Sequence, residues 1–196
     1  MNALDRLESG SRAAVRSAKC CVGLHEGKIL TRDEILNEIK AGNVKIEPFE
    51  EFQVGPASVD LRLGNEFRVF RKVHDLVQVD DEADSTQITE LVTVGDRFVL
   101  MPGETVLGIT VERLSLPPYL CGWLEGRSRF ARMGLMVHIT ASFMQPGIRN
   151  RQVLEISNVS PVPLALKPGT LICQFIFARC EGRAVYEGSY RDQMHP

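Results

Sequence analysis

The sequence has little of several features that would assign a protein to a class at once. Its five cysteines are an odd number, and no two are spaced as Cys-x-x-Cys, so neither a disulfide framework nor a zinc knuckle is indicated. Its 23 Lys and Arg residues against 25 acidic residues argue against a protein that coats nucleic acid. No apolar run approaches the roughly 18 residues that span a bilayer, and the first residues hold no signal-type apolar segment. These absences predict a soluble, cytoplasmic protein with neither a membrane nor a nucleic acid as partner.

The composition that remains describes one folded domain. Of the 196 residues, 44% are hydrophobic and 24% are charged, which supplies enough apolar material for a core. We expect a domain over residues 28–196 and a flexible extension over residues 1–27. The arginines of the extension are also typical of transit peptides, but Asp5 and Glu8 argue against a targeting role.

A short helix is predicted near the start of the domain. Thr31 and Glu34 have the spacing of a capping box, and Gly42 supplies a stop signal. Between them, Ile35, Leu36 and Ile39 form one apolar stripe.

Short strands are predicted over the rest of the domain. Segments rich in Val, Ile, Leu and Phe alternate with turn signals such as Pro-Gly, which favours a sandwich, jelly roll or barrel over βαβ units. The acidic stretch 80–84 is expected to be a solvated loop without function. The strands are expected at residues 58–63, 66–70, 97–100, 105–111, 135–141, 152–157 and 170–178.

Residues 126–132, Gly-Arg-Ser-Arg-Phe-Ala-Arg, form the first segment with recognisable chemistry. A guanidinium group matches phosphate oxygens two at a time, and a Gly-Arg-Ser turn lets backbone N–H groups approach an anion. Arg127, Arg129 and Arg132 therefore indicate either a phosphate site or a surface turn with solvated charges.

A Pro-Gly turn at 146–147 leads into the second such segment, which contains Glu155. If this strand alternates, Glu155 and Val153 share one face while Leu154 and Ile156 take the other. A carboxylate among apolar residues is costly unless it is paired or functional, and desolvation would raise the pKa of Glu155 into the range useful for proton transfer. A strand residue pointing into water is the alternative interpretation.

No metal-binding pattern accompanies these segments. The four histidines are not spaced with cysteine or glutamate for metal binding, and the signature of the zinc deaminases is missing, so no zinc is expected. We expect His138 to be a core histidine with a satisfied hydrogen bond, and Cys121 and Cys173 to be small buried residues.

In this order, the segments resemble the dCTP deaminase branch of the trimeric dUTPase superfamily. The resemblance implies a mainly β fold, a distorted jelly roll or β-barrel of the dUTPase-like type with a short N-terminal helix. It covers the chain from about Lys28 to Gln193 and rests on the motifs at residues 45–49, 54–67, 126–135, 146–155, 167–177 and 186–193.

The resemblance also implies catalytic roles. Glu155 falls on the family's catalytic glutamate, which shuttles a proton while water attacks C4 of cytosine and ammonia leaves. Ser128 and Arg132 fall on residues that position this water, polarise the base or bind phosphate. Ala141 falls where a small residue leaves room for the water.

Nucleotide binding is implied for a wider set of residues in a homotrimer. Arg127 would reach the triphosphate from a neighbouring subunit, and Mg²⁺ would accompany that triphosphate. The ligands would be dCTP and dUTP, and dTTP is a candidate inhibitor. The other implied contacts are Ser128, Arg129, Arg132, Gln145, Val153, Tyr186, Tyr190 and Gln193.

Four residues depart from the family pattern. Gln145 replaces an aspartate; it can hydrogen-bond a sugar hydroxyl but cannot act as a base. Arg129 replaces a serine and Ser189 a lysine at phosphate-binding positions. Asn150 replaces a glycine and is expected to strain its turn.

Three functions follow from these observations. The leading one is hydrolytic deamination of dCTP to dUTP and ammonia, with Glu155 as proton shuttle. A dUTP diphosphatase, or a bifunctional deaminase and diphosphatase, comes second because Gln145 counts against it. A non-catalytic nucleotide-binding regulator comes third, and Gln145, Arg129, Ser189 and the short C-terminal tail favour it.

Overall fold

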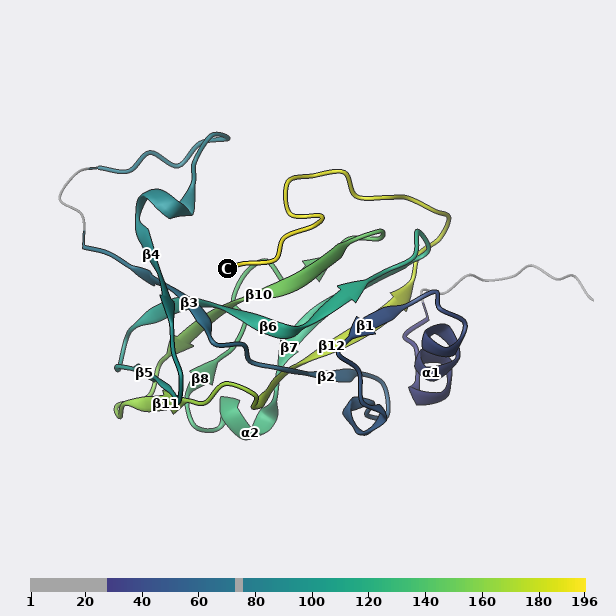
Figure 1. Cartoon of the computed structure of the whole chain (residues 1–196), viewed down its shortest axis with the longest axis horizontal. Helices are drawn as coiled ribbons and strands as arrows, with labels where there is room; N and C mark the ends of the chain where they lie inside the picture. Colours follow the sequence, from purple (N-terminus) through teal and green to yellow (C-terminus); the bar gives the residue numbers. More distant parts are fainter. Residues whose placement is uncertain (1–27, 73–75) are drawn as a thin grey trace, which may run out of the picture.

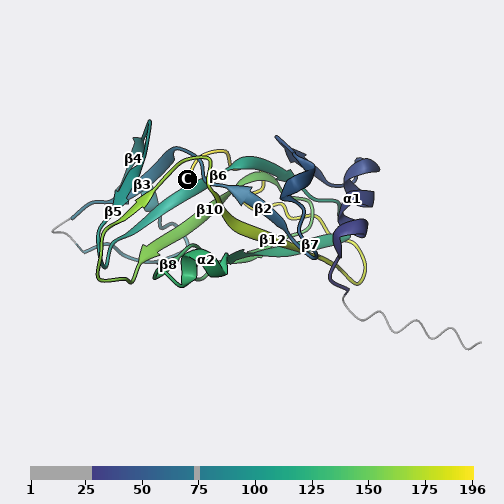
Figure 2. The same ribbon diagram turned by 90° about the horizontal axis from the view of Figure 1, so that it is seen from below.

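The computed structural model describes residues 28–72 and 76–196, so the predicted extension 1–27 lies outside the described residues. Strands dominate this range, which confirms the predicted mainly β fold. In Figures 1 and 2, α1 lies at one end of the molecule and β4 at the other. None of the helices in the described ranges has the length and apolar character needed to cross a membrane. The helical segments are α1 (Arg32–Lys40), η1 (Glu51–Gln53), η2 (Ser85–Gln87) and α2 (Ser128–Ala131).

The described strands form three sheets. The largest has the order β4-β3-β6-β10-β8, with β1 also paired to β6. Its strands are β1 (Lys45–Glu47), β3 (Glu66–Phe70), β4 (Thr89–Thr93), β6 (Thr105–Ser115), β8 (Leu135–Met136) and β10 (Arg149–Asn158). The second sheet contains β2 (Val59–Arg62), β12 (Leu171–Arg179), β7 (Leu120–Gly126) and β9 (Phe143–Met144) in that order, and the third pairs β5 (Phe98–Leu100) with β11 (Leu164–Leu166).

The core lies between the sheets and consists of large apolar side chains. Phe67 is fully buried on β3 and stacks on Phe98 with 4.7 Å between ring centroids. Gly122 on β7 is packed so closely that a Cβ atom there would come within 2.3 Å of the Phe175 ring. The cysteines expected inside are indeed buried. The fully buried large residues include Leu61, Leu63, Leu100, Ile109, Leu114, Leu120, Leu124, Leu154 and Phe177.

The predicted helix is confirmed as α1, but its predicted capping box does not form. Thr31 has the extended backbone of an N-cap, yet its side chain makes no capping hydrogen bond. The start of α1 is held instead by tertiary contacts: the Arg32 N–H donates to the carbonyl of Pro56 at 2.8 Å, and Ile35 is buried in the core. Long-range packing therefore fixes this helix more than its local cap does.

Most of the predicted strands are present, and one is largely wrong. The prediction for residues 66–70 matches β3, whereas the strand expected at 135–141 ends at Met136. The chain leaves the sheet there because the N–H groups of Ile139 and Thr140 donate to the carboxylate of Glu155 rather than to a neighbouring strand.

Strand β10 positions the candidate site. It runs antiparallel to β6, with Glu155 opposite Leu107, and its burial alternates as predicted. Leu154 and Ile156 are fully buried, whereas Val153 and Glu155 are only partly covered. The sheet therefore turns Glu155 away from the core.

Candidate active site

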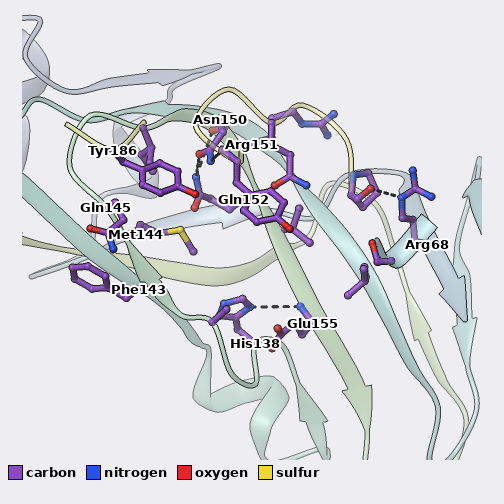
Figure 3. Close-up of a pocket in the computed structure, with 18 of the residues that line it drawn as sticks. Arg68, His138, Phe143, Met144, Gln145, Asn150, Arg151, Gln152, Glu155 and Tyr186 are labelled. Carbon is purple, nitrogen blue, oxygen red and sulfur yellow. Dashed lines mark hydrogen bonds between the residues drawn. The ribbon is translucent and has the colours of Figure 1, made fainter. Parts of the chain in front are cut away.

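A cavity of about 790 Å³ lies beside β10, within the usual size range of small-molecule sites. Its walls come from six parts of the chain (Figure 3): β10 itself, the segment from His138 to Ile148, residues 83–86 at the start of η2, the C-terminal residues from Tyr186 onward, Arg68 on β3 and Leu107 on β6. Part of the acidic stretch expected to be a solvated loop therefore borders the cavity, although it is exposed as predicted.

Seven of the predicted site residues meet at this cavity. β10 and the segment before it supply four of them, and the C-terminal segment supplies the other three. They are Ala141, Gln145, Val153, Glu155, Tyr186, Tyr190 and Gln193.

Glu155 is the most heavily hydrogen-bonded of these residues. Its Oε2 accepts from the backbone N–H of Thr140 at 2.6 Å and of Ile139 at 3.1 Å. The Thr140 hydroxyl lies 2.9 Å from Oε1 and 3.0 Å from Oε2. Burial raises the pKa of Glu155, but these bonds and the nearby His138 outweigh it, so the net pKa is lowered. The raised pKa expected from the sequence is therefore wrong, and Glu155 is held as a carboxylate.

His138 lies at the site rather than in the core, so the expectation of a satisfied core histidine is wrong. It borders the cavity, and its Nδ1 is 3.5 Å from the backbone nitrogen of Glu155. Its Nε2 is buried and has no hydrogen-bond partner among the described residues. No local sequence pattern signalled this position, because it depends on contacts that residues 138–140 make with Glu155, 15 to 17 residues away.

Within one chain, the arginine-rich segment is kept away from this cavity. Arg127 precedes α2 and is engaged elsewhere: it donates to the carbonyl of Leu171 at 2.8 Å and pairs with Asp60 at 2.9 Å. Ser128, Arg129 and Arg132 are exposed, and none of the four borders the cavity. The structure thus separates the predicted phosphate segment from Glu155 in a single subunit.

Several residues at the cavity were missed by sequence reasoning. Arg151 borders it and donates to the carbonyl of Thr110 at 2.6 Å, and Arg68 borders it from β3. Arg151 shares the partly covered face of β10 with Val153 and Glu155, so strand alternation was the signal that could have found it.

Asn150 shows none of the strain expected from its replacement of glycine. It lies within β10, while the left-handed conformation of the preceding turn is taken by Gly147, with φ of 81°. Its Nδ2 donates to the carbonyl of Tyr190 at 2.6 Å. Asn150 therefore fastens the C-terminal segment to the wall of the cavity.

Comparison with known proteins identifies the family of the chain. The family model described as dCTP deaminase-like matches residues 29–180. The chain belongs to the dCTP deaminase-like family. A relative from Parafrankia sp. (strain EAN1pec), called "dCTP deaminase, dUMP-forming", is 42% identical over 86% of this chain and 88% of its own length. A protein of the same name from Mycolicibacterium vanbaalenii is 43% identical over 77% of this chain and 80% of its own.

A solved structure shows the same fold. The crystal structure of 2′-deoxycytidine 5′-triphosphate deaminase from Agrobacterium tumefaciens superposes with a TM-score of 0.63 at 22% identity. The match covers 79% of this chain and 49% of that one, so the chain spans about half the length of that protein.

Proposed function

We propose that this dCTP deaminase-like protein removes the amino group of dCTP by hydrolysis and then converts the product to dUMP. The observation that carries the proposal is the Glu155 carboxylate, held ionised by Thr140 and Ile139 at the wall of a cavity large enough for a nucleotide. Such a group can accept a proton from water at neutral pH, as a deaminating enzyme requires.

Glu155 carries the proton in the first reaction. Water adds through its oxygen to C4 of cytosine, and Glu155 takes the proton that the water loses. Glu155 returns this proton to N3 of the base. It then carries the proton of the new hydroxyl on C4 to the amino nitrogen, the bond from C4 to this nitrogen breaks, and ammonia leaves as the C4 carbonyl forms. The products are dUTP and ammonia, and the carboxylate is regenerated. His138, beside Glu155, favours the charged carboxylate by its positive charge when protonated.

The final product proposed here differs from the dUTP expected from the sequence. The Parafrankia and Mycolicibacterium relatives are both called dUMP-forming. We therefore favour the bifunctional alternative, in which a second water cleaves dUTP to dUMP and diphosphate. Gln145 borders the cavity but cannot take a proton from that water. Its amide can orient the water by a hydrogen bond.

The site is completed by a neighbouring subunit in the assembly that we propose, a homotrimer. The support is the separation described above: Arg127 to Arg132 carry the positive charge that a triphosphate needs, yet they border no part of their own cavity. In a trimer, Ser128 and Arg132 of one subunit would meet Glu155 of the next. Mg²⁺ would enter with the substrate, bound to its triphosphate.

Incubation of the protein with dCTP, with ammonia and diphosphate followed separately, tests the proposal. We expect one ammonia for each dCTP consumed, and dUMP as the nucleotide that accumulates. Parallel incubations with dCMP, CTP and dUTP define the substrate. Release of ammonia with accumulation of dUTP would restrict the function to deamination, and the absence of ammonia would refute it.

A further inference from the structure

We propose that Cys121 and Cys180 are a redox pair, which a hydroperoxide converts to a disulfide that ties the end of β12 to β7. The inference goes beyond the proposed function, because it requires no nucleotide. The spacing of the cysteines in the sequence could not indicate this pair, since only the pairing of the two strands brings its members together.

Strand pairing places the two cysteines on one face of the sheet. Cys121 on β7 lies opposite Ala178 on β12. The pairing continues one step beyond β12, because the N–H of Cys180 donates to the carbonyl of Tyr119 at 2.9 Å. Residues two positions apart on a strand share a face, so Cys180 is the diagonal neighbour of Cys121 across the pair.

The side chains of the two cysteines meet between the strands. The Cys121 Sγ lies 3.7 Å from the carbonyl oxygen of Ala178, and the Cys121 thiol is hydrogen-bonded to the thiol of Cys180. Both cysteines are free, as is Cys173, which is fully buried in the core. Among the described cysteines, the structure therefore brings these two together as candidates for a disulfide.

Exposure and acidity determine which thiol reacts first. Cys121 is 9% exposed, whereas Cys180 is partly open to solvent. Burial, and then the neighbouring Cys180 thiol, raise the pKa of Cys121 to about 11, so Cys121 holds little thiolate at neutral pH. Cys180 is therefore the thiol that meets the oxidant, and Cys121 is the thiol that resolves the product.

The oxidation takes place in two steps. With hydrogen peroxide, the Cys180 thiolate attacks one oxygen, the O–O bond breaks, and a sulfenic acid and water form. The Cys121 sulfur then gives up its proton and attacks the Cys180 sulfur, the S–O bond breaks, and the hydroxide leaves with that proton as water. Together the two thiols lose two electrons and two protons, and the peroxide becomes two water molecules. A thiol reductant reverses the bond by exchange.

The disulfide would fasten the connection that leads from β12 to the cavity. In Figure 1, the chain leaves β12 near α1 and turns back toward β10. Along this path the N–H of Ala184 donates to the carbonyl of Pro118 at 2.9 Å, and the N–H of Tyr186 donates to the carbonyl of Pro146 at 2.8 Å. Tyr186 borders the cavity. Because the new bond excludes conformations in which the connection separates from β7, oxidation would stabilise this wall of the cavity.

Treatment of the full chain with hydrogen peroxide tests the inference. After digestion without reduction, we expect mass spectrometry to show a peptide that joins Cys121 to Cys180, lighter than the two separate peptides by two hydrogen atoms. Dithiothreitol should remove this peptide. The Tm should rise by about 5 °C or more on oxidation and return on reduction, because the disulfide closes a long loop.

Serine variants separate the two steps. Cys121→Ser lacks the resolving thiol, so it should accumulate the sulfenic acid at Cys180, which dimedone traps, with no rise in Tm. Cys180→Ser should give neither product at this pair. Cys173→Ala is the matched control and should keep both the linked peptide and the rise in Tm. The inference is overturned if Cys180 of the parent is oxidised without joining Cys121, if it joins Cys20 or Cys21 instead, or if the linked protein has an unchanged Tm.

Discussion

Thr140 donates two hydrogen bonds to the carboxylate of Glu155. Its backbone N–H lies 2.6 Å from Oε2, and its hydroxyl lies 2.9 Å from Oε1. Both groups stabilise the charged form of the acid, and they lie in the irregular segment that leaves the sheet after Met136. The proton affinity of the proposed catalytic group is therefore tuned by a loop residue outside β10.

Replacement of Thr140 by valine removes the hydroxyl while preserving the shape of the side chain. Since the hydroxyl favours ionised Glu155, we expect the pKa of Glu155 to rise when the hydroxyl is removed. The acidic limb of the pH profile for kcat would then move to higher pH, so the variant would lose activity at a pH where the parent is still active. Thr140→Ser keeps the hydroxyl and should leave the limb in place. An unchanged limb in Thr140→Val would show that the hydroxyl does not tune Glu155.

Glu155→Gln is expected to reduce ammonia release from dCTP by at least about a hundredfold, because the amide cannot accept a proton. Calorimetric affinity for dCTP should remain within a few-fold of the parent, since the side chain keeps its size. Deamination at the parent rate would disprove the proton-shuttle assignment. A parallel loss of binding would instead indicate a role in substrate recognition.

Gln145→Asp tests what limits the second reaction. A carboxylate at this position can accept a proton from the attacking water, so diphosphate release from dUTP should accelerate, by about tenfold or more if proton transfer is limiting. Ammonia release from dCTP should change less. Separate assays of the two products make the comparison, with Gln145→Asn as an amide control. Equal changes in both rates would contradict a selective role for residue 145 in the second step.

Mixing two inactive variants tests whether the site is shared between subunits. Glu155→Gln lacks the proton acceptor, and Arg132→Ala lacks a guanidinium of the segment that borders no cavity of its own. We expect little activity from either alone and a gain when the two are unfolded together and refolded. Neither variant refolded by itself should show a gain. If the mixture stays inactive although mass measurements show mixed trimers, the shared site is wrong.

Glu38 gives a prediction for stability. Burial raises its pKa, but hydrogen bonds from Asn43 and Tyr119 and the ion pair with Arg179 outweigh it, so the net pKa is lowered from 4.5. A carboxyl group whose pKa is lowered by folding stabilises the fold at pH values above its ordinary pKa. This stabilisation is lost as the pH falls through the pKa of the folded state. Glu38→Gln should therefore reduce the free energy of unfolding by about 1 kcal/mol at pH 7, with a smaller difference below pH of about 4.

Denaturant unfolding at both pH values provides the measurement. Glu34→Gln is the control, since Glu34 also faces Arg179 but its side chain is 53% exposed. Its effect should be within about half a kcal/mol. An equal loss of stability in the two variants would show that the hydrogen bonds and ion pair of buried Glu38 stabilise the fold no more than the exposed ion pair of Glu34.

Local sequence patterns predicted much of the fold and the part of the site that lies on β10. The alternation of Val153, Leu154 and Glu155 predicted which face of β10 is covered, because a strand embedded in a sheet must bury every second residue. The same reasoning failed for residues 137–141, which have the composition of a strand. There the decisive contacts are bonds to Glu155, some 15 residues away, and no local pattern encodes them.

The position of the arginine segment could not be predicted from the sequence for a similar reason. Its composition predicted affinity for phosphate, but not that Arg127 would pair with Asp60 in the same subunit and away from the cavity. The capping pattern at Thr31 likewise predicted the helix but not the contact with Pro56 that holds it. In each case the competing partner is distant in sequence and becomes a neighbour only in the folded chain.

The C-terminal segment has a consequence for the behaviour of the protein in solution. The N–H groups of Arg149 and Arg151 on β10 donate to the carbonyls of Arg191 and Gln193, at 2.8 and 3.0 Å. Without these bonds, the side of β10 away from β6 would present unpaired backbone groups to other chains. The segment that closes the cavity thus also shields a sheet margin from intermolecular β-pairing, so a change that loosens it would promote aggregation as well as weaken the site.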